Sequence, residues 1–230
     1  MRIGGFHRFS LIDYPDKICA IVFTQGCNFR CPYCHNPELI DDTISGLIKF
    51  SESDIISFLG QRKGRLDAVT ITGGEPLLQP DLSKFLFSVK EMGYLVKLDT
   101  NGSLPSRLER IINYNLIDYI AMDIKSSIEK YEYVTGKPVE KAKILDSIRL
   151  IMDSGLNYEF RTTAVKDLLN MDDFYRIGNI IKDASLYVLQ KFVPSKMLEK
   201  EFINLSPCSD QEMENIRKTM DGFVKRCIVR

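Results

Sequence analysis

The sequence has no excess of charge of either sign. Its 31 lysines and arginines balance its 31 aspartates and glutamates, so the formal net charge at pH 7 is zero. A strongly basic face for nucleic acid or for an anionic membrane surface is therefore not predicted. Long apolar runs are lacking as well, since none approaches the ~18 residues that a membrane-spanning helix needs. The segment 1–17 is polar and rich in turn formers, unlike a secretory signal, so a cytoplasmic protein is expected.

The sequence also lacks the setting in which its six cysteines would form a disulfide framework. Such frameworks belong to small secreted domains, whereas this chain has 230 residues and no secretory signal. Cys27, Cys31 and Cys34 lie close together in the chain, and no fourth cysteine stands near them. Clustered thiols in a reducing cytosol more often bind metal or carry out redox chemistry.

The order of predicted strands and helices indicates an α/β fold. Short β-rich runs alternate with longer segments of helical periodicity, and no internal repeat or long linker interrupts them. This alternation is typical of parallel strands with helical crossovers, in too few units for a complete eight-unit barrel. A partial barrel and a doubly wound sheet both fit. Strands are predicted at 19–24, 67–74, 94–102, 117–125, 157–165, 185–194 and 223–230, and helices at 51–62, 80–93, 105–115, 139–155, 171–183 and 209–221.

Motifs of polar residues and glycines follow four of the predicted strands. The cysteine loop follows the first strand, and GGEP (73–76), DTNG (99–102) and DIK (123–125) follow the next three. In parallel α/β folds, active sites assemble at this carboxyl edge of the strands. The four motifs therefore predict one active site.

The missing fourth cysteine suggests a catalytic iron–sulfur cluster. Three thiolates can each hold one iron of a four-iron, four-sulfur cluster, which leaves the fourth iron without a protein ligand. An open coordination position is what a catalytic metal centre needs in order to bind substrate. Gly26 would let the chain turn sharply into the loop, and Pro32 would stiffen it between the second and third cysteines.

Two other interpretations of the cysteine loop stay open at this point. A zinc site is one, with Cys208 or Cys227 as a distant fourth ligand; His35 directly follows Cys34, and adjacent residues seldom bind one tetrahedral ion together. A thiol–disulfide switch between Cys31 and Cys34 is the other.

The motifs resemble those of radical S-adenosylmethionine (SAM) enzymes. CNFRCPYC (27–34) fits the Cys-x3-Cys-x2-Cys signature of that family, and GGEP fits its second signature. LDTNG and DIK resemble strand ends of glycyl-radical-enzyme activating proteins. The opening segment GFHRFSLIDYPDKICAIVFTQGCNFRCPYCHNPEL is most similar to activating proteins of anaerobic ribonucleoside-triphosphate reductase. The resemblance implies a partial (β/α)6-type TIM barrel in one domain over 1–230, with an N-terminal β-hairpin extension at 1–17 and the barrel at 18–230.

The resemblance also implies cofactors and a reaction. One [4Fe-4S] cluster would be held by Cys27, Cys31 and Cys34, with SAM on its open iron. Reduction would cleave SAM to methionine and a 5′-deoxyadenosyl radical, which removes a hydrogen atom from a backbone glycine of a partner enzyme. The residues expected to bind SAM are Tyr33, Gly73, Gly74, Glu75, Asp99, Thr100, Lys125 and Arg161. A monovalent cation, as in some relatives, is an alternative ligand for Asp99, Thr100 and Asp123.

Several of these residues also have a structural interpretation. Asp-Thr-Asn-Gly is a good turn sequence, Glu75-Pro76 could open a helix, and Lys125 could be a solvated side chain. Arg161 could contact the partner rather than SAM. Residues expected to have only structural roles are His7, Cys19, His35, Asn36, Cys208 and Cys227.

Anaerobic ribonucleotide reductase is the expected partner, with a flavodoxin- or ferredoxin-type protein as electron donor. A single cluster is expected, because residues 35–72 hold no cysteine and leave no room for a ferredoxin-like insert. The alternatives are an activase of another glycyl radical enzyme, such as a formate-lyase type, and a compact small-molecule enzyme similar to 7-carboxy-7-deazaguanine synthase. The third alternative is a non-catalytic interaction module held together by zinc.

Overall fold

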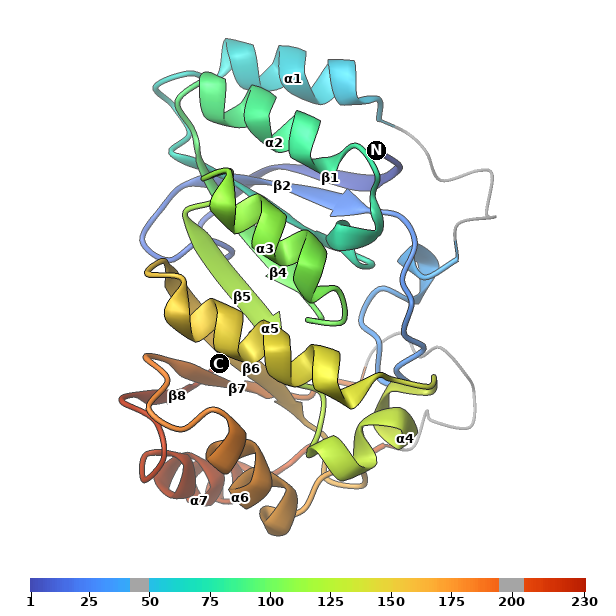
Figure 1. The fold of residues 1–230 in the computed structure, drawn as a ribbon, viewed down its shortest axis with the longest axis vertical. Helices are drawn as coiled ribbons and strands as arrows, with labels where there is room; N and C mark the ends of the chain where they lie inside the picture. Colours follow the sequence, from blue (N-terminus) through green and yellow to red (C-terminus); the bar gives the residue numbers. More distant parts are fainter. Residues whose placement is uncertain (42–49, 195–204) are drawn as a thin grey trace. The chain divides into compact units, whose positions relative to one another are not determined.

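Strands and helices alternate along the chain in the computed structural model, which describes residues 1–41, 50–194 and 205–230 (Figure 1). The described strands are β1 (Ile3–Ser10), β2 (Cys19–Thr24), β3 (Ala68–Gly73), β4 (Leu95–Thr100), β5 (Tyr119–Asp123), β6 (Asn157–Ala164), β7 (Tyr187–Lys191) and β8 (Cys227–Val229). The described α-helices are α1 (Glu52–Gln61), α2 (Leu82–Glu91), α3 (Pro105–Asn113), α4 (Tyr131–Thr135), α5 (Lys141–Asp153), α6 (Met171–Ile180) and α7 (Asp210–Met220). Short 3-10 turns occur at η1 (Pro37–Leu39), η2 (Pro76–Leu78) and η3 (Ile128–Lys130). Every predicted strand and helix is found, most of them shortened at their ends.

Local chemistry explains where several helices begin. Ser51, Asn170 and Ser209 each form a capping box, in which the side chain accepts from a backbone N–H three residues on and an acidic side chain there accepts from the cap. Two backbone donors at each helix start are satisfied in this way. Helix α4 was not predicted, because its five residues carry too little periodicity.

Contacts divide the chain into two units, of which unit 1 comprises Met1–Asn28, Glu38–Thr100 and Ser106–Ile120. Its strands are hydrogen-bonded in chain order from β1 to the first residues of β5. Strands β2, β3 and β4 run parallel, as the alternation predicted. Helices α1, α2 and α3 lie along one side of these strands (Figure 1). The carboxyl ends of β2, β3 and β4 carry the first half of the cysteine loop, GGEP and DTNG.

Unit 2 comprises Phe29–Pro37, Asn101–Pro105 and Ala121–Arg230. The last residues of β5 and strands β6, β7 and β8 follow one another in its strand order. Strands β6, β7 and β8 run parallel. Phe160, Phe174, Tyr187 and Phe192 are fully buried and give this unit an aromatic core. The single domain expected over 1–230, with an extension at 1–17, stays a prediction.

The N-terminal extension forms a β-hairpin with the first parallel strand rather than within itself. Strand β1 pairs antiparallel with β2, from Ile3 opposite Thr24 to Ser10 opposite Cys19. The turn that follows β1 places Tyr14 in a buried cluster with Cys19, Ala68 and Tyr119 at the amino ends of the strands. Burial is the main cause that raises the pKa of Tyr14 to about 12. The turn thus closes the end of unit 1 opposite to the cysteine loop.

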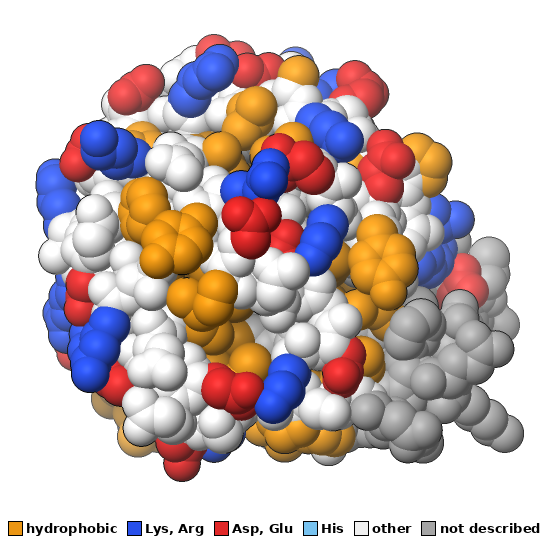
Figure 2. All heavy atoms as spheres, turned by 90° about the horizontal axis from the view of Figure 1, so that it is seen from below, with side chains coloured by type: hydrophobic (Ala, Val, Ile, Leu, Met, Phe, Trp, Pro, Cys, Tyr) orange, Lys and Arg blue, Asp and Glu red, His pale blue; other side chains and the backbone are white. Residues whose placement is uncertain are grey.

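One face of the protein mixes charges of both signs. Figure 2 shows acidic and basic side chains interspersed over one face, with apolar side chains in small separate groups. Among the described helices, none has both the length and the apolar character needed to cross a bilayer.

Replacing Tyr14 by Ala should lower the free energy of unfolding by about 3 kcal/mol, because it removes a buried aromatic ring. The ring is 6 % exposed and lies 5.7 Å from that of Tyr119. Urea unfolding of the two proteins would measure the change. The matched control is Ile12→Ala in the same turn, since Ile12 is 85 % exposed. A loss as small as that of the control would mean that Tyr14 does not close the core.

Candidate functional site

The first half of the cysteine loop is held in unit 1 by backbone hydrogen bonds. Gly26 has a φ of 100°, so the sharp turn predicted there is confirmed. The N–H of Gly26 donates to Leu39 (2.8 Å) and that of Cys27 donates to Ile40 (3.1 Å). The buried amide of Gln25 donates to two carbonyl oxygens of the same returning segment, those of Glu38 and Asp41. The backbone that carries Cys27 is therefore held by hydrogen bonds to the returning segment 38–41.

The two glycines of GGEP are required by the cysteine loop itself. Gly73 has a φ of 111°, and a Cβ there would lie 2.4 Å from the backbone nitrogen of Thr24. A Cβ on Gly74 would lie 2.1 Å from the carbonyl oxygen of Gly26. The backbone after β3 thus touches the backbone after β2. This contact explains the glycines without a ligand, and the expected contact of both with SAM stays a prediction.

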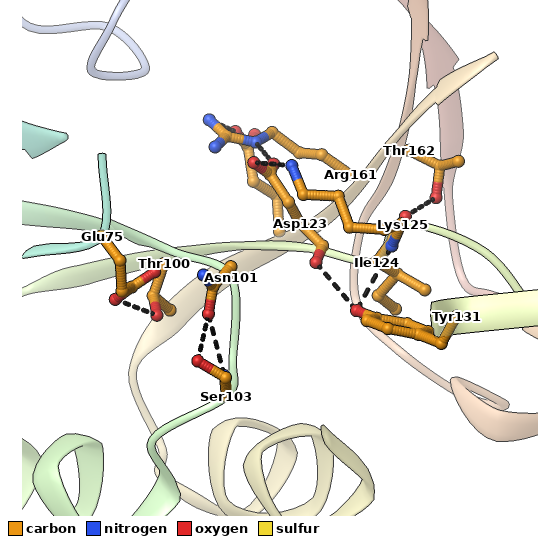
Figure 3. Close-up of polar contacts among 11 residues, drawn as sticks. Glu75, Thr100, Asn101, Ser103, Asp123, Ile124, Lys125, Tyr131, Arg161 and Thr162 are labelled. Carbon is orange, nitrogen blue, oxygen red and sulfur yellow. Dashed lines mark hydrogen bonds and ion pairs between the residues drawn. The ribbon is translucent and has the colours of Figure 1, made fainter. Parts of the chain in front are cut away.

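Glu75 is a buried carboxylate that organises its own strand end, as Figure 3 shows. Its Oε1 accepts from the N–H of Leu77 (3.1 Å), so Glu75 caps η2 as its structural interpretation predicted. The same oxygen accepts from the hydroxyl of Thr100 (2.9 Å), at the end of β4. Glu75 and Thr100, both candidates for SAM binding, are thereby brought together.

Asp99 lies beside a buried lysine of its own strand. The ammonium of Lys97 is 2.8 Å from Oδ1 of Asp99, and the Lys97 side chain is 3 % exposed. Lys97 and Asp99 are two residues apart in β4, so both project from the same face.

The second half of DTNG forms a turn in unit 2. Oδ1 of Asn101 accepts from the N–H (3.0 Å) and the hydroxyl (2.6 Å) of Ser103. Gly102 has a φ of 74°, and a Cβ there would meet the side chain of Met122 at 2.1 Å. Asn101 and Gly102 therefore have the turn-forming roles that their residue types predicted.

The second half of the cysteine loop is held in unit 2 by α4. The N–H of Arg30 donates to Thr135 (2.7 Å), and the rings of Phe29 and Tyr131 meet edge to face at 6.3 Å. A Cβ on Gly136 would lie 2.7 Å from the carbonyl oxygen of Arg30. Helix α4 thus supports the segment that carries the second and third cysteines.

A turn joins these two cysteines. The N–H of Cys34 donates to the carbonyl of Cys31 (3.1 Å), with Pro32 and Tyr33 between them. None of the six cysteines is in a disulfide. Among the described residues, no group of three or more His, Cys, Asp or Glu side chains is placed to hold a single metal ion. A cubic cluster does not require such a group, because each of its irons takes one thiolate. The three thiols fit a [4Fe-4S] cluster by the chemistry of the donor set.

Asp123, Lys125 and Arg161 form a compact charged group at the end of β5 and on β6 (Figure 3). Nζ of Lys125 is 3.0 Å from Oδ2 of Asp123, and Nε of Arg161 donates to Oδ1 of Asp123 (2.7 Å). The hydroxyl of Tyr131 accepts from the N–H of Lys125 (3.3 Å) and donates to the carbonyl of Asp123 (3.4 Å). Lys125 is therefore an ion-paired residue, not a freely solvated side chain.

The charged group is extended by Glu159, which is fully buried on β6. Nη1 of Arg230 lies 3.2 Å from Oε2 of Glu159, and Nη1 of Arg161 lies 3.9 Å from Oε1 of Glu159. Among the described residues of this group, three cations therefore face two carboxylates.

The neighbours of this group shift several pKa values. Burial disfavours the charged form of Asp123, but Arg161 and Lys125 outweigh it and hold the pKa of that carboxyl well below its usual range. Burial likewise opposes the charge of Lys125, yet Asp123 and Cys31 raise its pKa well above the usual value. Burial, with the charge of Cys31, raises the pKa of Tyr33. Tyr33 thus lies buried among Cys31, Lys125 and Asp123, and its predicted contact with adenine stays untested.

The remaining histidines and cysteines have the surroundings of structural residues. Burial and the charge of Lys125 lower the pKa of His35, while His7 is exposed on β1 with its ring against Phe23. Cys19, Cys208 and Cys227 are buried. Burial raises the pKa of each of these three thiols, that of Cys227 to about 12. A thiol that stays protonated is a poor metal ligand and nucleophile.

Three residues that organise the site were not predicted. Gln25 ties the loop to its returning segment, Lys97 pairs with Asp99, and Tyr131 binds the backbone on both sides of Ile124. The position of Lys97 in the sequence could have indicated its role, because it interrupts the apolar run of a buried strand two residues before Asp99. No sequence pattern indicates the role of Tyr131, since only the fold brings α4 beside the strand end.

The chain matches the family model of the radical SAM superfamily over residues 21–177. It is 35 % identical over 234 residues to a Methanocaldococcus jannaschii protein provisionally described as a glycyl-radical enzyme activating enzyme. The aligned region covers 99 % of this chain and 95 % of that protein. A pyruvate formate-lyase-activating enzyme of Clostridium pasteurianum is 31 % identical, over 79 % of this chain and 76 % of that enzyme. A 7-carboxy-7-deazaguanine synthase of Methanothermobacter thermautotrophicus is 43 % identical, but only over 44 % of this chain and 38 % of that enzyme.

Solved structures agree on the fold. Streptococcus suis SuiB bound to S-adenosylmethionine has a TM-score of 0.68 at 14 % identity, over 90 % of this chain; the chain spans 48 % of SuiB. TYW1 with a lysine-pyruvate adduct has a TM-score of 0.59 at 17 % identity, over 89 % of this chain and 73 % of that chain. These likenesses, with the parallel strands and helical connections, confirm the expected fold class.

Replacing Gly74 by Ala should disrupt the cysteine loop, because the new Cβ would meet a backbone oxygen that has no side-chain freedom. We expect a loss of about 3 kcal/mol in the free energy of unfolding, together with poor incorporation of iron on anaerobic reconstitution. Thermal melting and iron analysis would measure both.

The matched control is Gly60→Ala in α1, where a Cβ would meet nothing within 4 Å. Alanine there should stabilise the helix by about 0.5–1 kcal/mol. Wild-type stability and iron content in the Gly74→Ala protein would contradict the close contact between the two strand ends.

Proposed function

The chain belongs to the radical SAM superfamily, and from this membership we propose that it is an activating enzyme that generates a glycyl radical on anaerobic ribonucleoside-triphosphate reductase. The observation that carries the activase function is the similarity to the M. jannaschii relative, which extends over 99 % of this chain and 95 % of the relative. The similarity to pyruvate formate-lyase-activating enzymes over most of the chain supports the same class of reaction.

When bound, the reduced [4Fe-4S] cluster supplies one electron that cleaves SAM to methionine and a 5′-deoxyadenosyl radical, which takes a hydrogen atom from the partner's glycine. Cys27, Cys31 and Cys34 would hold three irons of this cluster and leave the fourth to SAM. The loop offers no further cysteine to close that position.

Unit 2 would bind the carboxylate of SAM. Lys125 and Arg161 carry two positive charges against one on Asp123, and the residual positive charge suits an anion. Tyr131 fixes the backbone on both sides of Ile124, so Lys125 would be presented in one orientation. Tyr33, buried beside Lys125, would lie along the adenosyl part of SAM.

Unit 1 would bind the amine and ribose of SAM. Carboxylates accept hydrogen bonds from ammonium and hydroxyl groups, and Asp99 and Glu75 are the carboxylates at these strand ends. The hydrogen bond from Thr100 to Glu75 holds the two strand ends together. The backbone of Gly73 and Gly74 would contribute its polar groups beside them.

The proposed partner rests on the resemblance of the motifs in the opening segment to those of activating proteins of anaerobic ribonucleotide reductase. A formate-lyase type of glycyl radical enzyme is the second candidate, favoured by the 31 % identity to activating enzymes of pyruvate formate-lyase. The match to 7-carboxy-7-deazaguanine synthase covers less than half of this chain, so it supports a small-molecule substrate less well. A flavodoxin- or ferredoxin-type donor and a cytoplasmic location stay predictions.

Mixing the reconstituted, reduced protein with SAM and the anaerobic ribonucleotide reductase of the same organism should produce a glycyl radical. Electron paramagnetic resonance would detect the doublet on the reductase, and chromatography would count 5′-deoxyadenosine in the same tube. Deoxyadenosine without a doublet would keep the SAM chemistry and reject this partner, so that a formate-lyase type enzyme is mixed next. If a protein with an intact, reducible cluster forms neither deoxyadenosine nor a glycyl radical, that result would contradict the activase function.

Replacing Cys27, Cys31 or Cys34 singly by Ala should abolish SAM cleavage, because each thiolate holds one iron. Deoxyadenosine formation and the iron-to-protein ratio would be measured together. Cys208→Ala is the control, since Cys208 is buried and burial raises the pKa of its thiol. Loss of iron in the control would mean that the ligands are wrongly assigned. A colourless protein that retains zinc after anaerobic purification would instead support an interaction module.

A further inference from the structure

Lys97 is a buried cation in the middle of a parallel strand. It lies on β4, where it pairs in register with Thr70 of β3, and its side chain is 3 % exposed. Its ammonium is 2.8 Å from Oδ1 of Asp99 and 5.9 Å from the centroid of the Tyr119 ring. Removing an ammonium group from water costs several kcal/mol unless a partner compensates it.

Apolar and aromatic residues form a buried cluster on this face of the strands, made of Tyr14, Cys19, Ile21, Ala68 and Tyr119, with Phe23 and Leu95 packed against it. The hydroxyl of Thr70, beside Lys97, contacts Sγ of Cys19 (3.6 Å). An apolar residue at position 97 would extend this core at no electrostatic cost. A lysine in this position therefore calls for a reason outside the core, and the carboxylate of Asp99 at the strand end supplies one.

We propose that Lys97 is the built-in cation of Asp99: a positioning residue that compensates the charge of this carboxylate and orients it for SAM, and makes an alkali cation unnecessary there. The inference rests on the proposed function, because it assigns Asp99 to SAM. Lys97 does not touch the reacting atoms and acts through Asp99. A carboxylate has two oxygens and about four lone-pair sites, so an ammonium group on Oδ1 does not exhaust its capacity to accept from a ligand.

The other carboxylate named for a monovalent cation has the same arrangement. Asp123 lies 2.7 Å from Nε of Arg161 and 3.0 Å from Nζ of Lys125, all within unit 2. Each candidate carboxylate thus has a lysine or arginine of its own unit at ion-pair distance. An additional sodium or potassium ion would bring a further positive charge to groups that are already neutralised, so these residues do not fit an alkali cation.

The first test needs no substitution. The dissociation constant of SAM for the reconstituted native protein would be measured by equilibrium dialysis in choline chloride, sodium chloride and potassium chloride at equal ionic strength. We expect the same constant in all three salts. Binding that tightens markedly in potassium or sodium chloride would overturn the inference. A native protein that does not bind SAM in any salt would refute the proposed function, and the inference with it.

The second test removes the cation. In Lys97→Met, whose unbranched side chain ends one atom short of the lysine ammonium, the SAM dissociation constant in choline chloride should rise about tenfold, as expected for loss of one charge-assisted contact. Potassium or ammonium chloride should restore most of the affinity, because a small cation can then occupy the position of the lysine ammonium. A purely structural lysine would give no such rescue.

The matched control is Lys90→Met. Lys90 forms another, more exposed lysine–aspartate ion pair in unit 1, with both oxygens of Asp118 (2.6 and 2.7 Å), and this pair does not include Asp99. The control should melt at a lower temperature and bind SAM as the native protein does in every salt. Native-like affinity of Lys97→Met in choline chloride, or weak binding that no small cation restores, would overturn the inference. If Lys97→Met does not fold, the salt comparison on the native protein decides.

Discussion

The close approach of two backbones, after β2 and after β3, is the contact on which the site of this protein depends. Gly74 lies so near the carbonyl of Gly26 that no side chain fits between them. The N–H of Glu75 donates to the same carbonyl (2.8 Å), so the start of the cysteine loop and the GGEP motif form one hydrogen-bonded piece. Gln25 and Leu39 extend this piece to the returning segment of the loop. The hydrogen bonds of Gly26, Cys27 and Glu75 in this piece join backbone groups, so the backbone of Cys27 is held largely without side-chain rotamers.

Charge compensation within each unit is the second principle of the site. Asp99 has Lys97, Asp123 has Arg161 and Lys125, and Glu159 has Arg230. Buried charges are tolerated only when they are paired, and removing one member leaves the other uncompensated. The charged strand ends are therefore ordered before a ligand arrives, which reduces the entropy that binding has to offset. Among the described residues of the charged group in unit 2, the three cations Lys125, Arg161 and Arg230 face the two carboxylates Asp123 and Glu159, as expected for a site that would bind an anionic ligand.

Much of this arrangement was visible in the sequence. The alternation of strands and helices predicted every described parallel strand, and the spacing of the three cysteines predicted a cluster with an open iron. The turn glycines Gly26 and Gly102 were predicted as well, because a positive φ restricts the residue type. Helix α4 was missed because it is too short to show periodicity. The part that Tyr131 plays could not be read from residue type either, since a tyrosine in a polar segment is compatible with many surroundings.

The sequence by itself determined the chemistry and the fold class of this protein: three thiolates in one loop, glycines where side chains are excluded, and parallel strands that end in polar motifs. These features are local, and residue type and spacing suffice to encode them. Only the tertiary structure decided which groups compensate one another. It paired Lys97 with Asp99 and Arg161 with Asp123, joined Thr100 to Glu75 through a hydrogen bond, and placed Tyr14 at the opposite end of the strands. Such pairings join residues whose neighbourhood depends on the register of strands, which arises from the packing of the whole unit and not from any single segment.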